Sequence, residues 1–331
     1  MIPAKLTLTV CSARAVLLAL LVALASTALA EDIALPPCED CEPLAERSFV
    51  DVSHSYVSER FDSLARWIDG FFGERRADTE AANSFVRFRA EQQMAESGAA
   101  NARFRVRGKI SLPLLNEKLK LVFFDEEDAL IAGESLEETE TERENEGGVG
   151  LQYNVADGSE FRVDYRVGLR SGDQVRTGVR LRYLLALGER SQMRLTEELY
   201  WQDTRGFGSK TVLDIERLLN SNQLLRWSNR FDFSENTVGV PWASVLSFRH
   251  AFKADHAVAY YLRAAGDTRP AYRTMNYGPG MLYRINIWKK WLFFEFEPTY
   301  RWTREPETFK HEGVASVFFR LEVMFSEKHR Y

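Results

Sequence analysis

The side chains with the clearest chemical potential are arginines that recur at every second or fourth position of alternating segments. In segment 161–170, Arg162, Arg166 and Arg170 alternate with apolar residues such as Tyr165. Successive side chains of a β-strand point to opposite faces, so this segment has one apolar face and one charged face. The pattern recurs at 104–110 and, less cleanly, at 317–325. Rows of guanidinium groups attract anions, which indicates chemistry of binding or passage.

When the charged rows of all the alternating segments are assigned to one common face, cations outnumber acids on that face. If the strands enclose a water-filled path, such a lining favours small anions such as phosphate, carboxylate or anionic sugar. Charged side chains can also pair across strands with no transport, so a structural role stays open. The residues expected to line an anion path are Arg105, Arg107, Arg162, Arg166, Arg180, Arg182 and Arg230.

Serine and histidine residues raise the alternative of a hydrolase. Ser244 and His250 lie six residues apart on one row, and His256 begins the next expected strand. Six residues along a strand span about 20 Å, whereas a nucleophile and its base must approach within hydrogen-bond reach. His311 lies near Glu307 and Glu312, but a surface histidine beside acids is common. Enzymatic activity is therefore not expected, and a lipid hydrolase is the weakest alternative.

Two cysteines remain after the expected removal of the N-terminal segment. Cys38 and Cys41 form a C-x-x-C pair, which can be a redox motif or half of a zinc site. No second pair and no adjacent histidine accompany it, and an oxidising compartment favours a local disulfide. We expect a disulfide between Cys38 and Cys41, with no metal and no cofactor.

Residues 1–30 have the features of a cleaved signal peptide. Lys5 and Arg14 are basic, residues 15–25 are rich in Leu and Ala, and 28–30 read Ala-Leu-Ala. The apolar run is short for a membrane-spanning helix. We expect residues 1–30 to be removed and the mature chain to act outside the cytoplasm.

A helix is expected over residues 54–72, within an N-terminal segment 31–82 assigned to the periplasm. Apolar residues recur there at three- and four-residue spacing, with charged residues between them. Four roles stay open: packing against a rim, plugging an opening, lying along the inner-membrane interface, or docking on a periplasmic partner. The face expected to plug or dock consists of Phe61, Leu64, Trp67 and Phe71.

From residue 83 onward only strand-like segments follow, about fourteen in number, or twelve if the first hairpin lies outside the wall. In up-and-down membrane barrels both chain termini lie on one side, and short turns on that side alternate with longer loops on the other. The expected connections follow this order, and the two longest, 126–147 and 266–278, both fall on the side opposite the termini. Segment 125–146 contains eleven acids and one base, Arg143, which is typical of a solvated loop. The expected spans are 83–93, 101–112, 117–125, 148–156, 160–170, 174–186, 191–202, 207–217, 223–233, 239–252, 256–265, 279–288, 291–302 and 313–325.

Aromatic residues cluster near the ends of these strands, as in the interfacial girdles of membrane barrels. Among them are Trp288 and Trp291, and at the other ends Tyr200 and Trp201. The final alternating strand, which ends at Phe325, resembles the C-terminal recognition strand of bacterial outer-membrane β-barrels, although six residues follow it. The resemblance is to a superclass with porin-like architecture and to no narrower family.

The resemblance implies an all-β chain: a transmembrane antiparallel barrel over 83–325, followed by a tail, 326–331. The expected location is the outer membrane of a Gram-negative cell, with outer-membrane lipid and lipopolysaccharide as partners. The mildly acidic composition, with a formal net charge of −5, argues against nucleic acid as a partner. A channel that favours small anions is the expected function, and a non-transporting adaptor barrel that docks a periplasmic partner is the alternative.

Overall fold

The computed structural model describes residues 71–72, 84–112, 118–125, 147–158, 160–170, 174–269, 273–304 and 310–326. The predicted signal peptide and the Cys38–Cys41 disulfide lie outside these ranges. So do Phe61, Leu64 and Trp67 of the predicted helix face, the acidic loop 126–146 and the tail after Ser326. Of the predicted helix, Phe71 and Phe72 are described, and both are helical.

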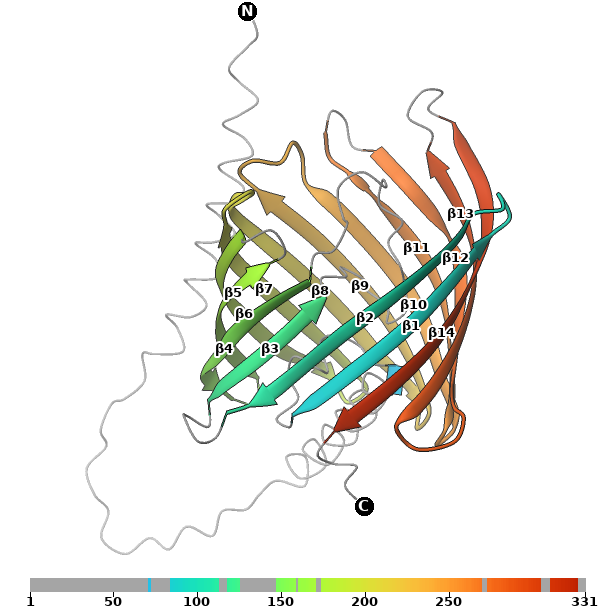
Figure 1. Cartoon of the computed structure of the whole chain (residues 1–331), viewed down its shortest axis with the longest axis horizontal. Coiled ribbons are helices and arrows are strands. Elements are labelled where there is room, and N and C mark those ends of the chain that lie inside the picture. Colours follow the sequence, from blue (N-terminus) through green and yellow to red (C-terminus); the bar gives the residue numbers. More distant parts are fainter. Residues whose placement is uncertain are drawn as a thin grey trace, which may run out of the picture. The chain divides into compact units, whose positions relative to one another are not determined.

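The described residues form fourteen antiparallel strands that close into a barrel with tilted strands (Figure 1). Each strand pairs with its neighbours in sequence, and the first strand also pairs with the last. The strands are β1 (Phe85–Ala95), β2 (Ala100–Ser111), β3 (Leu119–Asp125), β4 (Gly147–Asp157), β5 (Phe161–Arg170), β6 (Gln174–Gly188), β7 (Ser191–Gln202), β8 (Gly206–Asn220), β9 (Gln223–Ser234), β10 (Pro241–Lys253), β11 (His256–Asp267), β12 (Arg273–Asn286), β13 (Leu292–Arg304) and β14 (His311–Ser326).

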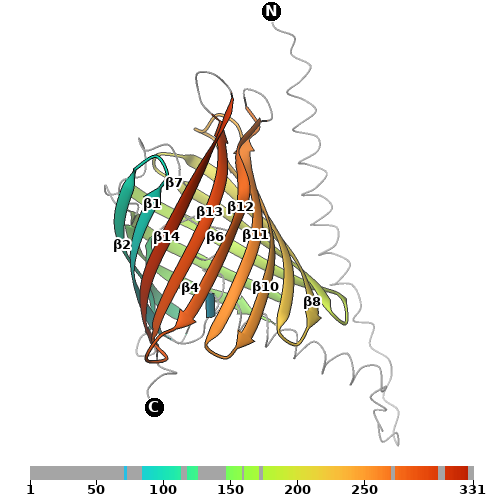
Figure 2. The ribbon, with the colours of Figure 1, turned by 90° about the vertical axis from the view of Figure 1, so that its right-hand side faces the viewer.

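Closure is direct, because β1 lies beside β14 along its whole length (Figures 1 and 2). Phe85 pairs with Ser326 at one end of this contact and Ala95 pairs with Ser316 at the other. The barrel therefore has no free sheet edge among the described strands. The predicted fold class and the count of fourteen strands are confirmed, and the twelve-strand alternative is excluded.

The two ends of the barrel differ in their connections. We call the end where β1 begins and β14 ends the terminal end. Short connections lie there, including the two-residue turns 189–190, 221–222 and 254–255. Asp125 and Gly147, which flank the longest interval between consecutive strands, lie at the opposite end. The predicted alternation of short and long connections holds only in part, because the connection 112–118 at the terminal end is longer than 171–173 and 203–205 at the opposite end.

The predicted strand limits agree with the structure within three residues, except at β12. The sequence predicts a loop over 266–278, but β11 extends to Asp267 and β12 already begins at Arg273. The predicted loop ends at Gly278, which precedes Pro279, and a Gly-Pro dipeptide usually marks a turn or a break in a strand. Here both residues lie inside β12, where they pair with Arg263 and Leu262 of β11. The predicted long loop is therefore wrong.

Each strand contributes two rows of side chains to the wall. One row carries large apolar residues that are exposed, such as Phe161, Tyr165 and Leu169 on β5. The other row carries charged residues that are buried, such as Arg162 and Asp164. Directly paired residues share a face, and this register assigns the exposed row to one continuous surface around the barrel. We call the two faces the exposed row and the enclosed row.

Among the described residues, no helix is both long enough and apolar enough to cross a membrane.

Candidate functional site

Cations are concentrated on the enclosed row of five consecutive strands, β2 to β6. The acids on the same face of these strands are Asp164 and, at the last position of β4, Asp157. We call this surface the basic wall. Its described cations are Arg103, Arg105, Arg107, Lys109, Lys120, Arg162, Arg166, Arg176, Arg180 and Arg182.

Near the terminal end, the basic wall is held by a compact set of contacts around Asp164. Arg162 Nε lies 3.0 Å from Asp164 Oδ2, and Arg162 Nη1 lies 3.4 Å from Asp157 Oδ2. The Asn154 carboxamide donates to Asp164 Oδ1 at 3.1 Å. Lys109 and Lys120 are buried on the same face. Several cations thus share one buried carboxylate at this level.

Further from the terminal end, Glu198 of β7 marks the edge of the basic wall. Arg176 Nη2 donates to Glu198 Oε1 at 2.9 Å, and Arg166 Nη1 lies 4.0 Å from Glu198 Oε2. The side chain of Arg166 retains 32% exposure. The Glu198 carboxylate is therefore shared by Arg176 and Arg166, and the Arg166 side chain remains partly exposed on the enclosed row.

Six of the seven residues predicted to line an anion path lie on the basic wall. Arg105 lies 3.9 Å from Glu91 of β1, and Arg182 donates to the carbonyl of Gly158 at 3.3 Å. Arg230 is separate from them, on the enclosed row of β9, and is 8% exposed. The remaining predicted residues on the basic wall are Arg107, Arg162, Arg166 and Arg180.

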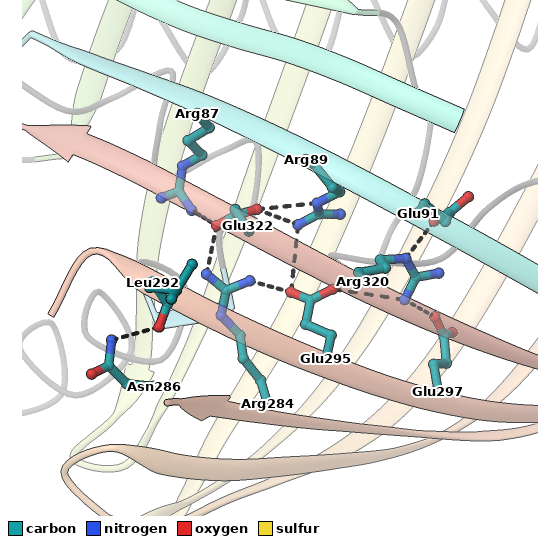
Figure 3. A network of polar contacts seen from close by, with 10 residues as sticks. All are labelled: Arg87, Arg89, Glu91, Arg284, Asn286, Leu292, Glu295, Glu297, Arg320 and Glu322. Atoms are coloured by element: carbon teal, nitrogen blue, oxygen red, sulfur yellow. Dashed lines mark hydrogen bonds and ion pairs between the residues drawn. The ribbon is translucent and has the colours of Figure 1, made fainter. Parts of the chain in front are cut away.

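A second group of charges lies where the barrel closes, on β12, β13, β14 and β1 (Figure 3). It contains equal numbers of arginines and glutamates, so its formal charge is balanced. We call it the seam network. Its members are Arg87, Arg89, Arg284, Arg320, Glu91, Glu295, Glu297 and Glu322.

Glu322 links three strands of the seam network (Figure 3). It accepts hydrogen bonds from Arg87 and Arg89 of β1, both at 2.7 Å, and from Arg284 of β12 at 2.5 Å. Arg320 donates to Glu91 and lies 2.5 Å from Glu297. Sequence reasoning placed all of these residues on the charged face, but it missed the separation of a balanced seam from a basic wall.

An apolar recess interrupts the enclosed face near the terminal end. Phe71 and Phe72, which are 8% and 1% exposed, fill it. The Phe71 ring meets that of Phe293 edge to face, with centroids 5.8 Å apart. In Figures 1 and 2 the segment is the short blue element at the lower end of the barrel. The other buried members of the recess are Leu224, Val245, Ala257, Ala259, Tyr261 and Leu282.

Cations border this recess as well. The Arg284 guanidinium lies 5.9 Å from the Phe71 ring centroid and 4.1 Å from that of Phe293. Arg249 lies 5.8 Å from the Phe72 ring. These are cation–π distances, so the phenylalanine pair has both apolar and electrostatic contacts with the inner wall. Of the predicted plug or docking face, Phe71 is thus placed inside the barrel.

Two tyrosine side chains on the enclosed row extend across the neighbouring strand, and each hydroxyl donates a hydrogen bond to a carboxylate on the strand beyond it. Tyr200 of β7 packs against Gly208 of β8 and donates to Asp232 of β9 at 2.9 Å. Tyr261 of β11 packs against Gly280 of β12 and donates to Glu297 of β13. The sequence predicts Tyr200 as a girdle residue on the outside. That prediction is wrong, because Tyr200 belongs to the enclosed row and is 3% exposed.

The histidines considered as catalytic bases have other partners. His250 contacts the Asn222 carboxamide at 3.3 Å, and His311 Nε2 contacts the Thr274 carbonyl at 3.2 Å. His256 contacts Asp255 at 2.8 Å, and this hydrogen bond holds the pKa of the Asp255 carboxyl below its usual value. The Ser244 hydroxyl instead accepts a hydrogen bond from the Trp227 indole. Within the described ranges, no group of three His, Cys, Asp or Glu side chains is arranged to hold a metal ion.

Similarity to known proteins is confined to structure. No family model matches the chain, and no curated protein matches it. Among solved structures, the KdgM porin in complex with disordered oligogalacturonate is 10% identical, with a TM-score of 0.37; the match covers 73% of this chain and 98% of that one.

Two Pseudomonas proteins give similar matches. OprB of Pseudomonas putida is 10% identical with a TM-score of 0.43, covering 78% of this chain and 98% of that one. OccK11 (OpdR) of Pseudomonas aeruginosa is 9% identical with a TM-score of 0.43, covering 74% and 96%. These values assign no substrate. The closed fourteen-strand barrel itself gives the chain its place among proteins of porin-like architecture, the superclass that the sequence predicts.

Proposed function

We propose that the chain is an outer-membrane channel that favours small anionic solutes. The membrane location is supported by the exposed row, which carries large apolar side chains on every strand of the barrel. Only closed barrels and helices satisfy all their backbone groups inside a bilayer, and the described strands leave no edge unpaired.

The observation that carries the anion preference is the basic wall on β2 to β6. Cations lining a water-filled path lower the barrier for anions and raise it for cations, and a low-dielectric wall strengthens this effect. The rest of the enclosed face differs because its cations are interspersed with acids, as in the seam network. The path for an anion therefore runs along the basic wall, past Arg105, Arg166 and Arg180.

Barrel size is compatible with conduction. Eight-stranded barrels are filled by side chains, whereas barrels of about sixteen strands leave an aqueous channel. Fourteen strands lie between these cases. Phe71 and Phe72 then narrow the path at the terminal end, so we infer that the open cross-section is smaller than the strand number alone implies.

The test is the reversal potential of the refolded protein in planar bilayers under a potassium chloride gradient. We expect chloride selectivity in the unmodified protein. In the triple variant R105Q/R166Q/R180Q the selectivity ratio should fall several-fold. The matched control is R190Q/K289Q/K290Q, which removes the same charge from exposed turns and should leave the ratio unchanged. Zero conductance, or cation selectivity, would contradict the proposal.

The adaptor alternative receives less support from the described residues. It requires the predicted docking face to be offered to a periplasmic partner. Phe71, the described member of that face, is instead buried against Phe293. Deletion of residues 31–82 separates the two functions: a channel changes its conductance, whereas an adaptor loses a partner in a pull-down.

A further inference from the structure

A stripe of polar side chains crosses the exposed row of four adjacent strands, β7 to β10. The residues around it are large and apolar, including Leu199, Trp227 and Phe231, each at least 44% exposed. We call this group the polar stripe; its members are Glu197, Ser209, Thr211, Asn229 and Ser244.

The strand register arranges the polar stripe as two pairs on either side of Leu213. Glu197 of β7 pairs directly with Thr211 of β8, and Asn229 of β9 pairs directly with Ser244 of β10. Leu213 of β8 lies between them, because it is two residues from Thr211 and pairs with Asn229. Two strand spacings of about 4.8 Å and an offset of two residues along the strand, about 3.4 Å each, separate Glu197 from Asn229 by roughly 12 Å.

Within one copy, the hydrogen bonding of the stripe is incomplete. Glu197 accepts from Ser209 at 2.5 Å and from Thr211 at 2.6 Å, one hydroxyl for each carboxylate oxygen. Each oxygen can accept a further hydrogen bond. Ser244 accepts from the Trp227 indole at 2.9 Å. The Asn229 carboxamide has no hydrogen-bond partner among the described residues.

Lipid tails cannot supply the missing partners. A polar group that enters hydrocarbon without a hydrogen bond costs several kcal/mol, and an acidic side chain at mid-depth is also unfavourable. Glu197 and Asn229 both lie near the middle of their strands. This argument rests on the membrane location in the proposed function. A protein surface with donors and acceptors at the same spacing would remove the penalty.

We propose that the polar stripe is the contact between two copies of this chain related by a two-fold axis. The stripe holds an acceptor, Glu197, and an unused donor, Asn229, on either side of Leu213. A two-fold axis near Leu213 brings Glu197 of each copy to Asn229 of the other. Such an isologous contact requires a self-complementary surface, and the stripe meets this requirement. The occupant is therefore a second copy rather than an unrelated protein.

The test is disulfide crosslinking of the full chain in membranes, in the C38S/C41S background. Leu213→Cys places a thiol near the proposed axis and should give a disulfide-linked dimer on oxidation. Leu321→Cys is the control, since it is a leucine on the exposed row of β14 that is more accessible than Leu213, 44% exposed, and should stay monomeric. Equal crosslinking at both positions, or none at Leu213→Cys, overturns the proposal.

A second variant tests the polar contact itself. Asn229→Leu in the L213C protein should lower the dimer yield roughly tenfold, while the circular dichroism of the barrel is unchanged. Unmodified protein in mild detergent should have the mass of two chains; a monomer or a trimer contradicts the two-fold contact. The proposed function fails separately, through absent conductance, or through release of the protein from membranes by carbonate.

Discussion

Arg87 Nη1 lies 2.7 Å from Glu322 Oε1, and this ion pair connects the first strand of the barrel to the last. The two side chains are buried, with 5% and 1% of their surfaces exposed. Glu322 also binds Arg89 of β1 and Arg284 of β12. The contact joins residues 235 positions apart, so it forms only when the barrel closes.

We predict that Glu322→Gln weakens closure of the barrel. The substitution keeps the volume of the side chain but leaves the arginines around it without their shared charge. Removing one partner of a buried ion pair typically costs about 3–5 kcal/mol. Urea unfolding of the protein in micelles, followed by tryptophan fluorescence, should show a loss of this size. Glu312→Gln, at an exposed position of the same strand, is the control and should change stability by less than about 0.5 kcal/mol.

The basic wall gives a prediction about ionic strength. Mobile ions screen fixed charges over about 10 Å at 0.1 M salt and about 3 Å at 1 M salt. Anion selectivity that arises from the field of many arginines should therefore decline as salt rises at a constant gradient. Reversal potentials at several mean concentrations measure this. Selectivity that is independent of salt would instead indicate a single tight binding site.

The sequence predicts the strands well where alternation is uninterrupted. Segment Phe161–Arg170 has one apolar and one charged row, and β5 has these limits. Prediction fails at the start of β12, where the expected strand begins at residue 279 and the observed strand begins at Arg273. Only the fold shows why glycine is needed there: a Cβ at Gly278 would lie 1.9 Å from the Tyr300 carbonyl of β13.

The sequence does not predict which charged side chains form ion pairs with each other. Alternation assigns Glu91 and Arg320 to the charged face, but their contact depends on the register between β1 and β14. The recess that holds Phe71 and Phe72 likewise depends on which strands pair. It depends on small residues such as Ala257 and Ala259 that share a face with Leu282 of the next strand, a proximity that no local pattern encodes.

We predict that F71A/F72A increases single-channel conductance. Truncating a buried phenylalanine typically costs about 3–5 kcal/mol, which is enough to release the segment from its recess. The ion path at the terminal end then widens. The control is Phe207→Ala on the exposed row, 64% exposed, which should leave conductance unchanged. Unaltered conductance in the double variant would show that the pair does not narrow the path.

The close packing of Tyr261 on Gly280 makes a prediction about the inner wall. A Cβ at position 280 would lie 2.2 Å from Tyr261 Cζ, so Gly280→Ala must displace the tyrosine ring. The hydroxyl then loses Glu297, its acceptor on β13. Overpacking of this kind costs about 1–3 kcal/mol, and loss of the hydrogen bond adds to it.

The Tyr261→Phe variant separates the two effects, because it removes the hydroxyl and keeps the ring. If ring displacement already breaks the hydrogen bond, G280A/Y261F should be no less stable than G280A alone. Unfolding free energies of the four proteins give this coupling. Additive losses would mean that Tyr261 keeps its contact with Glu297 after the substitution, with the strain taken up by the backbone of β12.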